Sequence, residues 1–173
     1  MARAPQYLTL RDNRDDTGRL EIALRRLFVA LLTLVLVLGL SNVFGEEDTS
    51  SIARSASADL EVTAPYRLRG GLFYQGRFTV RAREDVESAT LVLDRGWTEQ
   101  THINTIEPSP VREASRNGKL ALDFGHISAG QLLIAYLQFQ VNPLNVGRRS
   151  QDVALYDGEQ LLGTVDRTVT VFP

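Results

Sequence analysis

The sequence predicts an all-β sandwich domain that follows one N-terminal transmembrane helix. One run of 19 uncharged residues, Leu27–Gly45, is apolar on every face, as a membrane span is. From Asp59 onward, apolar and polar residues alternate with the period of two that is typical of half-buried strands. These strand segments, about seven or eight of them, recur at the spacing of an antiparallel sandwich, and no convincing helical stretch interrupts them.

The apolar run has the length of a membrane span. In a helix that rises about 1.5 Å per residue, its 19 residues reach roughly 28 Å, close to the thickness of the hydrocarbon core of a bilayer. Basic residues gather before the run and include Arg25 and Arg26, whereas Glu46, Glu47 and Asp48 follow it. This asymmetry predicts a cell-membrane protein with a cytoplasmic N-terminus and an extracytoplasmic C-terminal domain.

Two other interpretations of the run stay open. A cleaved signal peptide has an apolar region of about 7–15 residues, which Leu27–Leu40 fits, and Gly39-Leu40-Ser41 resembles a weak cleavage site. Against cleavage, the preceding segment is long and mixed in charge, and residues 42–45 extend the span. The central helix of a soluble core would need helical partners that the rest of the chain does not offer. We favour the retained anchor; with cleavage, the same domain would be secreted.

The chain therefore divides into four parts. Residues 1–16 are polar and form a cytoplasmic tail, and residues 17–45 form a membrane-entering and transmembrane helix. Residues 46–58 are mostly small and polar, which indicates a flexible stalk. Residues 59–173 form the extracytoplasmic β-sandwich domain, whose roughly 115 residues are an ordinary domain size.

The expected strands follow one another in the order of the chain. Their sequences are "LEVTAP" (60–65), "GRFTVRAR" (76–83), "ATLVLD" (89–94), "VREASRNGKLALDFG" (111–125, a hairpin), "QLLIAYLQFQV" (131–141), "DVALYDG" (152–158), "LLGTV" (161–165) and "RTVTVF" (167–172). Asn117-Gly118 suits the tight hairpin turn, because that turn needs positive φ at both central positions. Asp157-Gly158 predicts a second turn. Residues 96–110 and 142–149 are expected to be a long loop and a turn.

Composition excludes several kinds of chemistry. The chain has no cysteine, which removes disulfides, thiol catalysis and zinc–thiolate sites. Eighteen of its 19 basic residues are arginine and one is Lys119, which indicates a GC-rich genome and hence a bacterium. Residues 46–173 carry 13 basic and 17 acidic side chains, so we expect no nucleic-acid partner.

Residues 120–158 resemble the second half of the immunoglobulin-like domains of bacterial cell-surface proteins. In those domains a strand leads into a glycine-containing corner, and a long strand then returns toward a second turn and a last hairpin. The corner corresponds here to residues 124–130 and the later turn to residues 142–147. More loosely, the chain is similar to single-span envelope proteins of GC-rich bacteria. The resemblance implies an immunoglobulin-like sandwich that acts as a spacer or as a partner-binding module.

Catalytic and cofactor motifs are not recognisable in the sequence. His102 and His126 lie 24 residues apart without a second ligand at helical spacing, and Asp123 precedes His126 at a predicted strand end. No GxSxG elbow and no phosphate-binding glycine loop occurs, since Gly70-Gly71 lies between strands. We therefore expect no enzyme activity, no metal and no cofactor.

The segment 96–110 is the first candidate for partner binding. It contains the only tryptophan, Trp97, together with the polar residues His102, Asn104 and Glu107. Long loops at the ends of sandwiches commonly carry binding function. Trp97 has a second interpretation, as a core residue of the sandwich, and the sequence does not decide between the two.

Arginines supply the other candidates. A row made of Arg67, Arg69, Arg77, Arg81 and Arg83 would share one exposed face if the two strands that carry it paired, and could then meet anionic lipid headgroups or wall polymers. We favour the simpler interpretation, a solvated sheet face that discourages edge pairing. Arg148 and Arg149 follow the later turn.

The sequence as a whole predicts a non-enzymatic envelope protein that docks onto or supports another membrane or envelope protein. Its bilayer contact would run through Leu27–Gly45. The alternative is a module that binds cell-wall polymer or glycan. The sequence predicts neither the identity of the partner nor an oligomeric state.

Overall fold

The computed structural model describes residues 18–41 and 47–173, in two separate units. Helix α1 (Gly18–Leu40) belongs to the first unit. Its segment Leu20–Leu40 has a mean hydropathy of 2.2 and is the one helix of the described residues that is long and apolar enough to cross a membrane. A signal sequence would meet the same criteria, so the retained anchor stays a prediction. The predicted tail, residues 1–16, lies outside the described residues, as do residues 42–45 of the predicted span.

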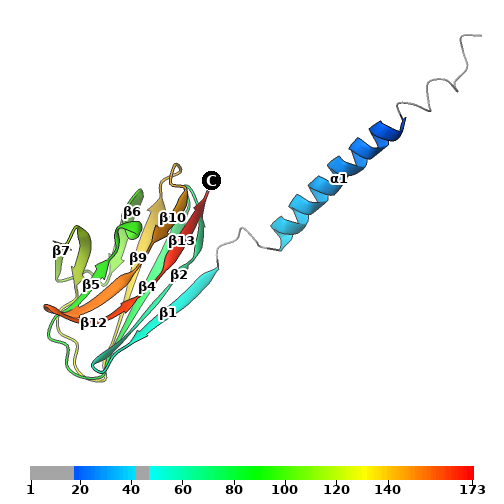
Figure 1. The fold of residues 1–173 in the computed structure, drawn as a ribbon. Coiled ribbons are helices and arrows are strands. Elements are labelled where there is room, and N and C mark those ends of the chain that lie inside the picture. Colours follow the sequence, from blue (N-terminus) through cyan, green and yellow to red (C-terminus); the bar gives the residue numbers. More distant parts are fainter. Residues whose placement is uncertain (1–17, 42–46) are drawn as a thin grey trace, which may run out of the picture. The chain divides into compact units, whose positions relative to one another are not determined.

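The second unit contains thirteen strands in three sheets (Figure 1). The first sheet has the order β1-β2-β4-β9-β6 and contains β1 (Asp48–Arg54), β2 (Ala58–Pro65), β4 (Phe73–Ala82), β9 (Leu132–Val141) and β6 (Thr101–Glu107). The second has the order β12-β11-β5-β8-β7 and contains β12 (Gln160–Val165), β11 (Val153–Asp157), β5 (Ala89–Leu93), β8 (Lys119–Asp123) and β7 (Arg112–Arg116). The third joins β10 (Gly147–Ser150), β13 (Thr168–Phe172) and β3 (Arg67–Arg69).

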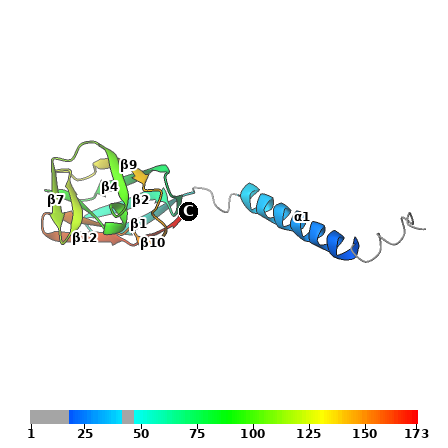
Figure 2. The same ribbon diagram turned by 90° about the horizontal axis from the view of Figure 1, so that it is seen from above.

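The two five-stranded sheets stack as two layers (Figure 2), which confirms the predicted all-β, immunoglobulin-like sandwich. Neighbouring strands pair antiparallel, with one exception in the small sheet, where β13 and β3 run parallel. The alternation along β4 follows the prediction, because Phe78 and Val80 point inward while Arg77 and Arg81 point outward. Period-two patterning therefore fixes which side chains reach the core.

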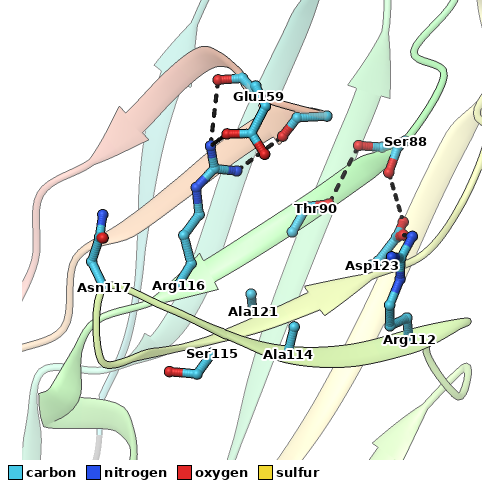
Figure 3. A pocket seen from close by; sticks show the side chains of 11 residues that line it. Ser88, Thr90, Arg112, Ala114, Ser115, Arg116, Asn117, Ala121, Asp123 and Glu159 are labelled. Carbon is cyan, nitrogen blue, oxygen red and sulfur yellow. Dashed lines mark hydrogen bonds and ion pairs between the residues drawn. The ribbon is translucent and has the colours of Figure 1, made fainter.

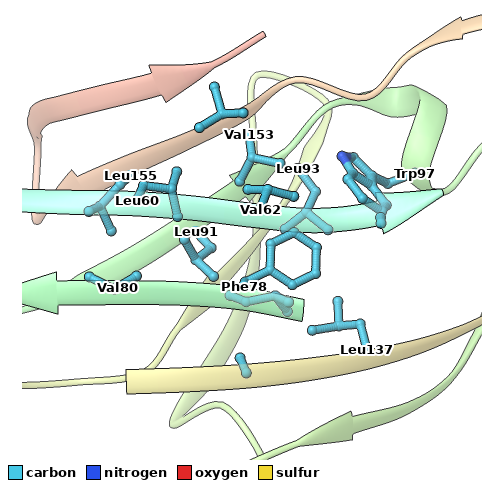
Figure 4. Packing of buried hydrophobic residues seen from close by; sticks show 14 of the residues in the cluster. Leu60, Val62, Phe78, Val80, Leu91, Leu93, Trp97, Leu137, Val153 and Leu155 are labelled. Atoms are coloured by element: carbon cyan, nitrogen blue, oxygen red, sulfur yellow. The ribbon is translucent and has the colours of Figure 1, made fainter. Parts of the chain in front are cut away.

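The core lies between the two layers and is filled from both (Figure 4). Phe78 of β4 and Leu137 of β9 face Leu91 and Leu93 of β5 across it. At one end, the 3-10 helix η1 (Arg95–Trp97) inserts the indole of Trp97 beside Phe78, with the two ring centroids 5.2 Å apart. The short helix is tightly held, because a Cβ added at Gly96 would meet the Ser150 carbonyl oxygen at 1.9 Å.

The predicted hairpins are confirmed. Asn117 and Gly118 join β7 to β8 with φ values of 53° and 72°, the left-handed pair that this turn requires. Asp157 pairs with Gln160 at the second turn, and Gly158 there has a φ of 55°.

The structure corrects the described part of the predicted stalk, residues 47–58, while residue 46 lies outside the described residues. Asp48–Arg54 forms β1, whose seven residues all pair with β2. The Ser50 and Thr63 hydroxyls lie 2.7 Å apart across this pair, and the Arg167 guanidinium donates to the Thr49 carbonyl oxygen at 3.0 Å. Small polar residues suggest flexibility by composition alone, but here an available strand edge supplies the backbone hydrogen bonds that order them.

The predicted loop 96–110 and turn 142–149 are also corrected, which explains the larger number of strands. The first contains the end of η1 and all of β6, and the second contains the start of β10. A bulge at Asn104 places Ile103 and Ile106 on the same inner side of β6, three positions apart. The bulge therefore removes the period-two signal that identifies a strand.

Candidate functional site

The first half of the outward side of β9, an interior strand of the first sheet, is apolar. Leu132, Ile134 and Tyr136 are exposed there, although an outward position of an antiparallel sheet is usually polar. Their cross-strand partners on β4 are Arg81, Thr79 and Arg77 respectively. Directly paired residues share one face of a sheet. We call these six residues the β9 face.

Charged residues border the β9 face on both sides. On the β6 side, Glu107 pairs with Tyr136. On the β2 side, Asp59 and Glu61 are the cross-strand neighbours of Arg81 and Thr79, respectively. The surface thus has an apolar centre and a rim that contains both signs of charge.

The structure divides the predicted arginine row. Arg77 and Arg81 share the β9 face, but Arg67 and Arg69 lie on β3, which pairs with β13 and not with β4. Arg83 follows the end of β4 and forms an ion pair with Asp59 at 2.8 Å. The prediction of one continuous arginine face is therefore wrong, because the chain turns after Arg69 and places the two groups in different sheets.

Trp97 is a core residue. This decides between the two interpretations of the sequence and corrects the prediction that Trp97 contacts a partner. Its side chain is 0% exposed. The indole Nε1–H donates to the Gln151 carbonyl oxygen at 2.9 Å, and the ring lies 5.2 Å from that of Phe139. A partner does not reach this side chain in the folded domain.

The remaining candidates from the 96–110 segment are exposed on β6. His102 pairs with Gln140 and Glu107 with Tyr136, so both belong to the outward side of the first sheet. Glu107 borders the β9 face, whereas His102 lies four β9 residues beyond it. Asn104 is the extra residue of the bulge and borders a hollow of about 410 Å³ between β6 and β7. The structure thus places His102 and Glu107 on the same side of the first sheet as Arg81, but His102 lies beside Gln140 and Arg81 beside Leu132, at opposite ends of β9.

Arg148 and Arg149 do not join that surface. Both lie on β10 in the three-stranded sheet, where Arg148 is exposed and Arg149 is half-buried.

A hollow of about 450 Å³ lies at one end of the first sheet. Phe73 and Tyr136 provide aromatic walls, while Asp48, Gln75 and Arg77 provide polar groups. The Arg77 Nη2 donates to the Thr63 hydroxyl at 3.4 Å.

The apolar outward residues of β9 were not selected from the sequence, although the signal for them was present there. When alternate residues of a strand fill the core, apolar residues at the intervening positions indicate a second contact.

A polar hollow of about 460 Å³ lies on the outward side of the second sheet (Figure 3). Arg112 pairs with Asp123 there at 3.3 Å, and Asp123 also accepts a hydrogen bond from the Ser88 hydroxyl at 3.1 Å. Arg116 reaches across to Glu159 and donates to the Gly158 carbonyl oxygen at 2.9 Å. Each arginine is thus already matched with a carboxylate of the domain, so this hollow offers little to an anionic ligand.

Of the residues that the structure describes, Tyr74, Asp94 and Arg167 have displaced pKa values, and Tyr74 also borders the hollow beside Phe73. Burial raises the pKa of the Tyr74 phenol, against the opposing effects of the hydrogen bond from Gln151 and the charge of Arg167. Burial lowers the pKa of Arg167, against Tyr74 and Asp48. Among the described residues, no group of three or more His, Cys, Asp or Glu side chains is placed to hold a metal ion. The absence of enzyme activity stays a prediction.

Neither a protein-family model nor a curated protein matches the chain. Among solved structures, CaCohA2 from Clostridium acetobutylicum is 16% identical, with 68% of this chain and 92% of that chain covered at a TM-score of 0.42. A non-cellulosomal cohesin from Archaeoglobus fulgidus is 15% identical over 64% and 88% of the two chains, at a TM-score of 0.38. A CARDB domain from Pyrococcus furiosus is 13% identical over 73% and 94%, at a TM-score of 0.37. Similarity this low assigns no family to the chain.

Proposed function

We propose that this chain is a single-span membrane protein of the cell envelope whose extracytoplasmic sandwich docks onto another membrane or envelope protein through the β9 face. The observation that carries the proposal is the apolar centre of that face, formed by Leu132, Ile134 and Tyr136. Protein–protein interfaces combine such a centre, in which aromatic and arginine side chains are enriched, with a polar rim.

The charges of the rim favour a protein partner. Arg77 and Arg81 lie on one side of the apolar centre and Glu107 lies on the other. A rim of mixed sign complements another mixed-sign protein surface, whereas a uniformly anionic polymer would be repelled by the carboxylates. Docking of this kind needs no catalytic group and no cofactor.

The proposed orientation rests on the charges around α1. Arg25 and Arg26 precede the apolar segment, and three carboxylates begin at Glu46 after it. This bias keeps the N-terminus cytoplasmic and places the sandwich outside.

We expect a photo-crosslinking amino acid at Ile134 to yield a discrete protein adduct in the host cell. The matched control is Leu161 on β12, which is likewise exposed but belongs to the second sheet. The adduct is identified by mass spectrometry of the full-length membrane protein after ultraviolet exposure. Adducts of the same protein from both positions would indicate chance proximity and would contradict docking through the β9 face.

The substitution Ile134→Asp is expected to weaken this contact by about tenfold or more, because it places a charge in the apolar centre of the interface. The yield of the adduct from a crosslinker at Tyr136 measures the loss. Since Ile134 points away from the core, the substitution should leave the thermal unfolding midpoint nearly unchanged. An unchanged adduct yield in a folded variant would contradict the proposed interface.

A glycan-binding role is the second candidate, and the hollow between Phe73 and Tyr136 favours it. Two aromatic walls with convergent polar groups are a general feature of small-ligand sites. If this role holds, isolated wall material retains the full-length protein, and Tyr136→Ala abolishes retention while Tyr156→Ala, on the opposite sheet, does not. Retention on wall material without a protein adduct from Ile134 would replace the docking proposal with this one.

A further inference from the structure

One end of the sandwich carries exposed apolar side chains on two neighbouring turns. Leu144 is 84% exposed and Phe73 is 63% exposed, and Leu72 and Val146 are exposed beside them. We call these four residues the apolar tip. They face away from the core, so the packing of the domain does not account for them.

Backbone contacts hold the two turns of the apolar tip together. The Gly71 N–H donates to the Val141 carbonyl oxygen at 3.1 Å, and the Val141 N–H donates to the Leu72 carbonyl oxygen at 2.9 Å. A Cβ at Gly70 would meet the Pro143 carbonyl oxygen at 2.6 Å, so the turns approach as closely as a glycine allows. The two turns that carry the apolar tip are thus held at a fixed distance from one another.

Arginines flank the apolar tip on the three-stranded sheet. Thr170 of β13 has Arg148 of β10 as its partner on one neighbouring strand and Arg67 of β3 on the other. Arg67 and Arg148 therefore share one face of that sheet. Arg69 lies two residues after Arg67 on the same face. The buried residues Leu68 and Val171 mark the other face as the inward one. Every residue of this sheet is described, and its outward positions contain no carboxylate.

The same end of the domain receives the chain from the membrane helix. Asp48, the first residue of β1, pairs with Pro65 and borders the same hollow as Phe73. Seven residues, 41–47, separate it from the end of α1. Even fully extended, the connection from Leu40 to Asp48 spans at most roughly 29 Å, which is less than the roughly 33 Å length of a ten-residue strand such as β9.

We propose that the apolar tip, with Arg67, Arg69 and Arg148, seats this end of the sandwich on the anionic lipid surface of the bilayer that holds α1. Apolar side chains then enter the boundary between headgroups and acyl chains, and the guanidinium groups meet lipid phosphates. The outward face of the three-stranded sheet carries arginines and no carboxylate, which matches an anionic phospholipid surface better than it matches a protein of mixed charge. The inference rests on the retained anchor of the proposed function and is independent of the partner protein.

The absence of cysteine makes a direct test available, since one introduced cysteine is the only labelling site. The full-length Leu144→Cys variant carries an environment-sensitive fluorophore, with one copy in each nanodisc. The discs contain phosphatidylcholine alone or with one third phosphatidylglycerol. Nitroxide-labelled lipid in the bilayer serves as the quencher, because it reports contact with lipid directly.

The control is Val111→Cys. Val111 is 76% exposed, and its side chain lies within 3.4 Å of the Cβ position of Gly125, in the corner at the opposite end of β9 from the apolar tip. We expect nitroxide lipid to quench the probe at 144 at least about threefold more than the probe at 111, and more strongly with phosphatidylglycerol present. Arg69→Gln and Arg148→Gln should each lower the ratio of seated to free domain in the anionic discs by about fivefold.

Each outcome of this test is decisive. Equal quenching at 144 and 111 in both lipid compositions overturns the inference while leaving the docking proposal intact. Strong quenching at 144 that is indifferent to phosphatidylglycerol and to the arginine variants overturns the assignment of anionic lipid. A full-length chain that does not enter the nanodiscs removes the anchor, and both proposals then fail together.

Discussion

Replacing Trp97 with alanine is expected to lower the free energy of unfolding of the sandwich by about 4 kcal/mol. The indole is fully buried between the rings of Phe78 and Phe139. Its removal leaves a cavity and also deprives the buried Gln151 carbonyl oxygen of its donor at 2.9 Å. Both effects act in the same direction, because the apolar contacts and the hydrogen bond are lost together.

The measurement is chemical unfolding of the full-length protein followed by circular dichroism, since the variant lacks the only tryptophan. Trp97→Phe should cost less, because a ring remains in the core and only the donor is missing. Val111→Ala is the surface control and should stay within about 0.5 kcal/mol of the unsubstituted protein. A Trp97→Ala variant that unfolds like this control would contradict the placement of the indole in the core.

This result bears on how binding data are interpreted. Because Trp97 supports η1 and the ends of β4 and β9 from inside, its removal can weaken binding without any contact between indole and partner. A loss of binding in a Trp97 variant therefore does not locate the binding surface. Ile134, which points outward from β9, is the position that separates contact from stability.

The fold could largely be predicted from local patterns. The strands around Phe78 and Leu137 alternate cleanly, since one side faces the core and the other faces water. The Asn117-Gly118 turn was predictable because its backbone conformation restricts the residues that adopt it. Where a segment's own residues impose its conformation, the sequence suffices.

The elements that the sequence did not reveal depend on distant partners. β1 pairs with its neighbour β2 but is also held by Arg167, more than a hundred residues later, and β3 is ordered by parallel pairing with β13, about a hundred residues later. The bulge at Asn104 conceals β6, because only its pairing with β9 restores the register. The candidate surface was missed for a different reason. The apolar residues at the outward positions of β9 were visible in the sequence, but only the pairing with β4 shows that arginines lie beside them.

Arg167 is the clearest case of a structural role that no local sequence pattern indicates. It lies just before β13, is 7% exposed, and directs its guanidinium under the β1–β2 hairpin. Nη1 donates to the carbonyl oxygens of Thr49 and Val62, each at 3.0 Å, and Nη2 donates to that of Ala64 at 2.7 Å. Its backbone N–H donates to the Asp152 carboxylate at 2.9 Å. One side chain thus ties β1 and β2 to the start of β13.

Replacing Arg167 with methionine is expected to destabilise the sandwich by about 3 kcal/mol or more, because methionine fills the space but leaves several buried carbonyl oxygens without a donor. Arg167→Lys should be intermediate, since an ammonium group donates hydrogen bonds but does not reproduce the fork of the guanidinium. Arg112→Met is the matched control. That arginine is largely exposed, and its pair with Asp123 lies at the surface, so its loss should cost at most about 1 kcal/mol.

Hydrogen exchange locates the effect within the domain. In Arg167→Met, the amides of β1 should exchange at least about tenfold faster than the global loss of stability predicts, while the amides of β9 should follow the global value. Exchange that accelerates equally in β1 and β9 would mean that Arg167 stabilises the sandwich as a whole and does not fasten β1 in particular.

Fastening β1 also limits the length of the connection between α1 and the sandwich, because a released Asp48–Arg54 segment would add seven residues to that connection. Arg167→Met should therefore also reduce lipid quenching of a probe at 144, although Arg167 lies in the interior and touches no lipid.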